Sequence, residues 1–124
     1  MKRISLFVGV LALMAIFIFV LTSEKDEITR IDVETLQNKL ENEEITLLDV
    51  RESFEYDGGH IEGAVNAPLS SLDANKLSYP KDEPIYVICR SGNRSAQAAS
   101  QLLDAGYTEI YDVSGGMMAW ESIE

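Results

Sequence analysis

One stretch decides the fold of this chain, Ile85-Tyr86-Val87-Ile88-Cys89-Arg90-Ser91-Gly92-Asn93-Arg94-Ser95, and it holds the only cysteine of the sequence. Residues 85–88 are apolar and favour β structure, which predicts a buried strand. Residues 96–103 place alanine and leucine at helical spacing, which predicts a helix. Cys89 is therefore expected at the carboxyl end of a strand, directly before a tight turn and a helix.

The turn after Cys89 suits an anion. Residues 91–93 are Ser, Gly and Asn, which tolerate tight turns, so successive backbone N–H groups can point inward. The start of the helix adds the positive end of its dipole, and Arg90 and Arg94 add two cations. We expect these groups to stabilise a thiolate and to lower the pKa of Cys89 below the ~8.5 of a free cysteine.

Two interpretations of Cys89 compete. An unpaired cysteine at the end of a strand is most often a small buried apolar residue. A packing cysteine does not require two arginines, a glycine and three small polar residues directly after it, so the surroundings favour a reactive thiolate. Because the chain has one cysteine, it forms no internal disulfide.

Three separated motifs resemble those of the rhodanese family of sulfurtransferases. Residues 89–95 resemble the active-site loop of that family, and the three motifs follow the family's order over about residues 28–123. The upstream motif consists of Asp49-Val50-Arg51-Glu52, Glu55-Tyr56 and Gly59-His60-Ile61-Glu62-Gly63-Ala64-Val65-Asn66-Ala67-Pro68. The closing motif consists of Gly115-Gly116-Met117 and Trp120.

The sequence predicts one α/β domain, because strand and helix patterns alternate and 124 residues suffice for a single core. We expect a mostly parallel sheet with helices on both faces, preceded by one N-terminal hydrophobic helix. The resemblance implies a single rhodanese-like domain. The predicted division is residues 1–23 as a signal peptide or membrane anchor and residues 28–124 as the domain.

The N-terminal segment has two interpretations. Residues 4–21 are apolar except for Ser5 and Gly9, and Lys2 and Arg3 precede them. The run exceeds the ~7–15 residues usual for a secretory signal and lacks an Ala-x-Ala-like cleavage site, which favours a retained membrane anchor through residues 4–21. The basic flank predicts that the domain lies outside the cytoplasm, membrane-anchored, or secreted or periplasmic if the segment is cleaved.

The charge balance excludes one class of partner. The formal net charge is −11 at pH 7, and the part beyond Lys2 and Arg3 is more negative still. Such a body repels nucleic acid, so no nucleic-acid partner is predicted.

Three further residues are candidates for the site. His60 could act as a base beside the thiol, but the resemblance implies a structural histidine that ties down its loop through a hydrogen bond. One histidine without further soft ligands does not predict a metal site. Asp49 and Arg51 fall on the same side of a strand end, and we expect them to form an ion pair that orders the loops around the site.

The resemblance implies sulfur transfer without a cofactor. The Cys89 thiolate would take the outer sulfur of a small anionic donor such as thiosulfate, and cyanide or a thiol acceptor would remove it from the persulfide. The loop N–H groups of residues 90–94 would hold the sulfur, while the side chains of Arg90 and Arg94 would attract the donor. The alternatives are a persulfide carrier for a partner protein, a phosphatase or arsenate reductase, and a binding module without turnover.

Overall fold

A computed structural model describes residues 2–22 and 27–124, with side chains described for residues 4–18 and 27–124. The first described element is helix α1 (Lys2–Thr22), and the domain follows from residue 27. Its elements in order are β1 (Glu27–Ile31), α2 (Val33–Asn42), β2 (Thr46–Asp49), α3 (Ser53–Asp57), β3 (Val65–Asn66), the 3₁₀ turns η1 (Leu69–Ser71) and η2 (Ala74–Lys76), β4 (Ile85–Ile88), α4 (Asn93–Asp104), β5 (Glu109–Val113) and α5 (Gly116–Ile123).

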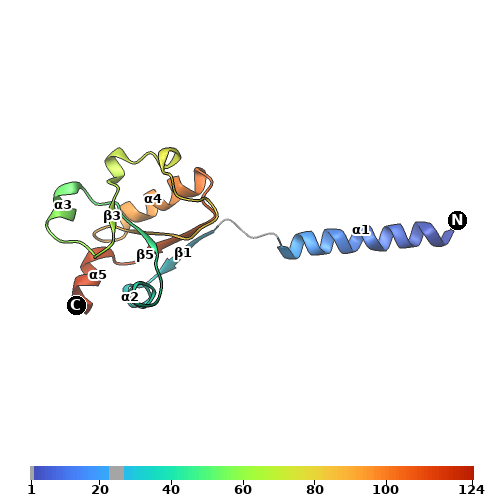
Figure 1. The fold of residues 1–124 in the computed structure, drawn as a ribbon, viewed down its shortest axis with the longest axis horizontal. Coiled ribbons are helices and arrows are strands. Elements are labelled where there is room, and N and C mark those ends of the chain that lie inside the picture. Colours follow the sequence, from blue (N-terminus) through green and yellow to red (C-terminus); the bar gives the residue numbers. More distant parts are fainter. Residues whose placement is uncertain (1, 23–26) are drawn as a thin grey trace.

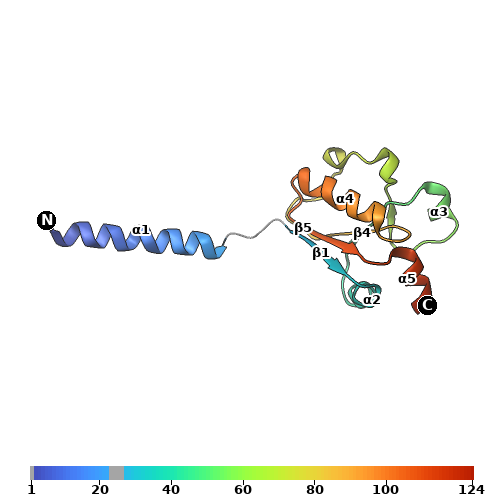
Figure 2. The ribbon, with the colours of Figure 1, turned by 180° about the vertical axis from the view of Figure 1, so that it is seen from behind.

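The five strands form one parallel sheet in the order β1-β5-β4-β2-β3. All four residues of β4 are buried, as expected for a central strand covered on both faces. Figures 1 and 2 show α4 on one face of the sheet and α2 and α5 on the other. The predicted α/β fold with a parallel sheet and helices on both faces is confirmed.

Alternating strand residues divide the core into two halves. Ile85 and Val87 point toward α4, where they pack with residues such as Ala98 and Leu102. Tyr86 and Ile88 point to the other face, where α2 and α5 contribute their apolar sides. Cys89 follows directly after β4, so this two-sided packing fixes the position of its backbone at the carboxyl edge of the sheet.

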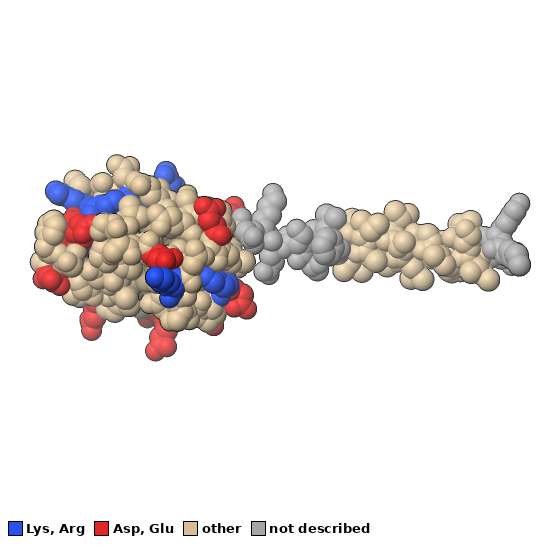
Figure 3. All heavy atoms as spheres, turned by 90° about the horizontal axis from the view of Figure 1, so that it is seen from above, with Lys and Arg blue, Asp and Glu red and all other residues tan. Residues whose placement is uncertain are grey.

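Helix α1 (Lys2–Thr22) carries exposed apolar side chains, among them Leu6, Phe7 and Leu13. Figure 3 shows no charged side chain on its described part, in contrast to the domain. In the part of the chain that the structure describes, no helix is long and apolar enough to cross a membrane. The predicted membrane anchor over residues 4–21 is therefore not supported.

The domain has a core of its own. Every residue that the structure records as buried lies between Val33 and Trp120, so α1 supplies none of them. Residues 27–124 thus hold both halves of the core and the whole sheet. The predicted boundary at residue 23 lies outside the described residues.

Candidate active site

Cys89 lies at the floor of a tight loop between β4 and α4. Its side chain is only 1% exposed. The backbone N–H of Gly92 donates to its sulfur at 3.0 Å, and Gly92 reaches this position with a φ of 106°, which suits glycine. Of the loop residues predicted to hold the sulfur through their N–H groups, Gly92 thus donates to it directly.

Ser95 completes the surroundings of the sulfur. It is fully buried on the first turn of α4, with its Oγ 3.5 Å from the Cys89 sulfur. The Ser95 hydroxyl donates to the carbonyl of Gly92 at 3.2 Å while the thiol donates to Ser95 Oγ. When the thiol ionises it can no longer donate, and the hydroxyl is free to turn its proton to the sulfur instead.

The pKa of the Cys89 thiol is lowered below its ordinary value. Burial alone raises this pKa, because a thiolate loses its hydration. Hydrogen bonds from the Ser95 hydroxyl and from the backbone N–H groups of Ser95, Gly92 and Ser91 outweigh that effect. A buried, stabilised thiolate can act as a nucleophile toward a narrow electrophile such as a terminal sulfur.

The first turn of helix α5 binds the backbone of the loop. The N–H of Met117 donates to the carbonyl of Cys89 at 2.7 Å, and that of Met118 donates to the carbonyl of Arg90 at 3.0 Å. Gly116 has a φ of 56°, and a Cβ at this position would lie 2.4 Å from the Cys89 carbonyl oxygen. Only glycine lets the two backbones approach this closely.

The two loop arginines differ in their surroundings. Arg94 forms a bidentate ion pair with Glu55 of α3, at 2.6 and 3.0 Å. This pair lowers the pKa of Glu55 to about 2. Arg90 is exposed and forms no ion pair with any residue that the structure describes. The sequence pattern predicts no role for Glu55, because a partner 39 residues away leaves no signal in the local pattern.

Asp49 and Arg51 form the predicted ion pair, with Arg51 donating to Asp49 at 2.8 Å. Asp49 is fully buried, and Arg51 also donates to the carbonyl of Gly59 at 2.8 Å. Asn66, which sequence reasoning missed, donates to the carbonyls of Asp49 and Arg51. The pair therefore ties the end of β2 to two neighbouring loops.

His60 lies on an exposed loop and stacks on Tyr56, with the ring centroids 3.7 Å apart. Its Nδ1 donates to the carbonyl of Tyr56 at 2.8 Å, and the Tyr56 hydroxyl donates to the carbonyl of Ala64. The contacts are those of a histidine that secures its loop. None of them reaches the Cys89 sulfur.

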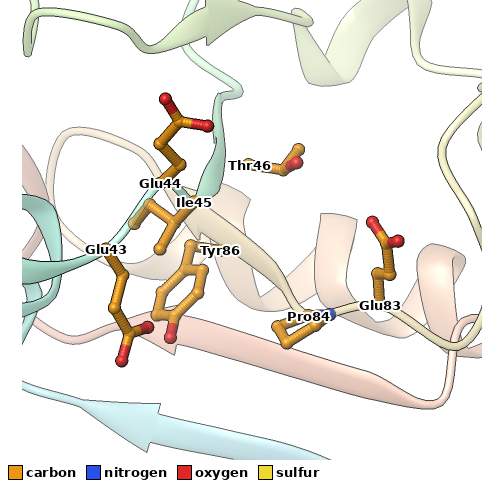
Figure 4. A pocket seen from close by; sticks show the side chains of 7 residues that line it. All are labelled: Glu43, Glu44, Ile45, Thr46, Glu83, Pro84 and Tyr86. Atoms are coloured by element: carbon orange, nitrogen blue, oxygen red, sulfur yellow. The ribbon is translucent and has the colours of Figure 1, made fainter.

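Two hollows on the surface of the domain differ in their distance from the loop of Cys89. A depression of about 260 Å³ beside the loop is lined by Arg51, Glu55, Arg90 and residues of α5. A larger hollow, about 470 Å³, lies instead at the amino ends of β2 and β4. Figure 4 shows the carboxylate of Glu43 pointing away from those of Glu44 and Glu83, so the three do not converge. Among residues 4–18 and 27–124 no cluster of three or more ligating side chains could hold a metal ion.

Several known proteins are similar in sequence to this chain. The chain is 47% identical to the uncharacterized protein YqhL of Bacillus subtilis over 74 residues, which cover 60% of this chain and 59% of that protein. It is 34% identical to a protein named Sulfurtransferase from Allochromatium vinosum over 94 residues, covering 75% and 88% of the two chains. The chain spans about half the length of other curated relatives that it matches.

A solved structure of a rhodanese-like domain protein from Staphylococcus aureus superposes with a TM-score of 0.67 at 34% identity, covering 74% of this chain and 90% of that one. Residues 32–123 match the sequence profile of the family described as Rhodanese, Rhodanese-like domain. With its buried cysteine loop, its parallel sheet and this match over most of its length, the chain belongs to the rhodanese-like domain family.

Proposed function

We propose that the domain is a sulfurtransferase that moves sulfane sulfur from a small anionic donor such as thiosulfate to cyanide or a thiol, through a persulfide on Cys89. The observation that carries this proposal is the Cys89 sulfur, buried beneath loop N–H groups that lower its pKa. Membership of a family with relatives named sulfurtransferase supports it. The intact cysteine argues against a binding module without turnover.

In the first step the Cys89 thiolate attacks the outer sulfur of thiosulfate. A bond forms between the two sulfurs, and the bond to the inner sulfur breaks with its electron pair, so sulfite leaves and a persulfide stays on Cys89. No general base is needed if the thiol is already ionised. Because Arg94 is neutralised by Glu55, we assign the attraction of the donor's oxygens chiefly to Arg90.

In the second step an acceptor removes the outer sulfur. Cyanide or a thiolate forms a bond to that sulfur while the bond to Cys89 breaks, and the electron pair returns Cys89 to the thiolate. The N–H groups of the loop, such as that of Gly92, stabilise the negative charge on Cys89 before and after the transfer.

The intact mass of the domain after incubation with thiosulfate tests this proposal. We expect a gain of one sulfur atom that cyanide or dithiothreitol reverses, and no gain in Cys89→Ser. Sulfur transfer to cyanide by Cys89→Ser would contradict the assignment of the nucleophile. One sulfur loaded without any turnover of cyanide would favour a persulfide carrier for a partner protein.

The length of the loop separates sulfur chemistry from phosphate chemistry. Four residues lie between Cys89 and Arg94, and a tetrahedral phosphate with three outward oxygens needs a wider cradle than one sulfur atom. We therefore expect negligible hydrolysis of aryl phosphates and no reduction of arsenate under conditions where thiosulfate reacts. A phosphate ester that is turned over faster than thiosulfate, with both activities lost in Cys89→Ser, would replace this proposal with a phosphatase.

The place of the domain in the cell stays a prediction from the sequence. Lys2 and Arg3 before the apolar run are typical of a secretory signal, which would place the domain outside the cytoplasm. Protease added to intact cells or spheroplasts should then digest the domain. Digestion only after lysis would contradict this location, and a shorter chain beginning near residue 23 or 24 would show that the segment is cleaved.

A further inference from the structure

A second, smaller cavity adjoins the loop that carries Cys89. It has a volume of about 210 Å³ and lies where the carboxyl ends of β1, β4 and β5 meet. Besides two glycines, its lining consists of Arg30, Ser91, Asn93, Asp112 and Ser114. No apolar side chain faces the cavity, and its size is below the ~300–1,000 Å³ of drug-sized sites, so it suits a small, strongly polar group.

Asp112 is the unusual member of this lining. Its side chain is 4% exposed, and its Oδ1 has no hydrogen-bond partner among the described residues. Its Oδ2 lies 3.8 Å from Nε of Arg30, which the register of the sheet places opposite on β1. Buried carboxylate oxygens are ordinarily hydrogen-bonded, because burial without a donor is costly.

Arg30 does not meet this need. Its side chain is 73% exposed, and the contact with Asp112 is longer than a hydrogen bond. The guanidinium therefore stands at the mouth of the cavity and the carboxylate at its floor. A carboxylate accepts and never donates, so its missing partner must be a donor, and a cationic donor forms the strongest bond.

A ligand that satisfies both groups carries an ammonium group at its inner end and a carboxylate at its outer end. The α-amino acid group has these two charges on one carbon. Ser91 and Gly92 of the cysteine loop line the cavity, and the backbone N–H of Gly92 also donates to the sulfur of Cys89 at 3.0 Å. A third substituent on the same carbon would thus start beside the loop that holds the sulfur.

We propose that this cavity binds the α-amino acid end of a small thiol that accepts sulfur from Cys89, with the ammonium group on Asp112 and the carboxylate on Arg30. This inference rests on the proposed sulfur transfer. The acceptor thiolate forms a bond to the outer sulfur of the Cys89 persulfide, the sulfur–sulfur bond to Cys89 breaks, and Cys89 leaves as a thiolate. The product is the persulfide of the amino acid thiol.

A binding experiment tests the site without any sulfur chemistry. L-serine, which has the same amino acid group and no thiol, is titrated into the ¹⁵N-labelled domain, residues 27–124 with Cys89→Ser. We expect saturable shifts of the amides of Ser91, Asn93 and Ser114, with no shifts from N-acetyl-L-serine, which lacks the ammonium group. Serine shifts that are absent, or equal to those of N-acetyl-serine, would overturn the proposal.

Two variants locate the binding groups in the same titration. Asp112→Asn should weaken serine binding tenfold or more, because it removes the charge that holds the ammonium group. Asp82→Asn, which removes an exposed carboxylate elsewhere on the domain, should leave binding as it is. Equal binding in Asp112→Asn would overturn the assignment. If Asp112→Asn fails to fold, the comparison of serine with N-acetyl-serine decides.

Kinetics then connect the site to sulfur transfer. Cysteine and N-acetylcysteine serve as acceptors, and the KM for cysteine is divided by the KM for N-acetylcysteine. Asp112→Asn should raise this ratio at least tenfold over that of the unmodified domain. Differences in the intrinsic reactivity of the two thiols cancel, because both proteins are measured with the same pair. Arg30→Gln should raise KM for cysteine and not for cysteamine, which lacks a carboxylate. Unchanged ratios would overturn the role of the cavity in acceptor selection. If the domain transfers no sulfur to cyanide, the proposed function is contradicted. The proposed binding site is still tested, because the serine titration does not depend on sulfur transfer.

Discussion

At the scale of single residues, the acidity of the thiol is set by hydrogen bonds rather than by exposure. Cys89 is almost completely buried, and burial by itself raises the pKa of its thiol. The side-chain hydroxyl of Ser95 and three backbone N–H groups reverse the shift. Of these donors only the hydroxyl can be removed by substitution without moving the backbone.

Ser95→Ala should therefore make Cys89 less reactive at neutral pH. Loss of the hydroxyl removes the largest of the effects that lower the pKa of Cys89, so the pKa rises and a smaller fraction of the thiol is ionised. We expect alkylation by iodoacetamide at pH 7 to slow several-fold and the midpoint of its pH profile to move upward. Ser100→Ala, an exposed serine on the same helix, is the matched control. A profile that stays in place in Ser95→Ala would contradict this role.

At the scale of elements, three helices converge on one loop. Helix α3 supplies Glu55 to Arg94 on α4, and the first turn of α5 supplies two N–H groups to the carbonyls of Cys89 and Arg90. Each contact joins segments that are distant in sequence, so the shape of the loop depends on the docking of all three helices.

The ion pair between α3 and α4 gives the domain a specific pH dependence. The pKa of Glu55 falls from 4.5 to about 2 in the folded state, chiefly because Arg94 donates to it. A lowered carboxyl pKa contributes stability that is fully present above the unfolded value and is lost as the pH falls toward the folded value. The contribution of Glu55 is therefore complete above about pH 4.5 and disappears near pH 2.

Glu55→Gln should reveal this contribution in thermal unfolding. We expect the Tm of the variant to lie below that of the unmodified domain at pH 7, and the difference to shrink as the pH falls from 4.5 toward 2. Glu62→Gln, which changes an exposed carboxylate, is the control. A Tm difference that is constant across this pH range would show that the ion pair is not its cause.

Gly116 tests the docking of α5 against the loop. Gly116→Ala would place a Cβ 2.4 Å from the Cys89 carbonyl oxygen in addition to straining a φ of 56°, and we expect it to lower the free energy of unfolding by about 3 kcal/mol or more. Gly63→Ala has a φ of 86° with open space around it, so it should cost only the ~1–2 kcal/mol of backbone strain. Urea denaturation measures both. An equal decrease in the free energy of unfolding in the two variants would show that the loop moves to make room for the added Cβ.

At the scale of the whole molecule, the domain is independent of the N-terminal helix in its packing. Both halves of the core lie on the two faces of the sheet, and all recorded buried residues fall within Val33–Trp120. Described side chains of α1 are exposed, including the large apolar ones. The stability of the fold and the function of the N-terminal segment are thus separate questions.

Removal of residues 1–26 should leave the domain as stable as it is in the full chain. The reason is that no recorded buried residue is lost, so the area that unfolding exposes in the domain stays the same. We expect the same midpoint and the same m-value in urea for residues 27–124 as for the full chain in one buffer. A lower midpoint for the shorter chain would show that α1 packs on the domain in solution.

Local sequence patterns were enough to predict the structure around the candidate nucleophile. Strand β4 (Ile85–Ile88) has the predicted bounds and helix α4 (Asn93–Asp104) contains the predicted residues 96–103, because apolar runs and turn residues act over a few neighbouring positions. The ion pair of Asp49 with Arg51 was predictable for the same reason, since alternation along a strand places both on one side.

Which distant groups meet depends on the tertiary fold and could not be predicted from local patterns. The sequence predicted that Arg94 would attract the donor, whereas folding commits it to Glu55, 39 residues away. The loose contact of Arg30 with Asp112 arises from the register of β1 on β5, and the cap of α5 on the loop arises from the close approach that Gly116 permits. Such contacts depend on how strands order themselves in a sheet and how helices dock on it, and no local periodicity records that arrangement.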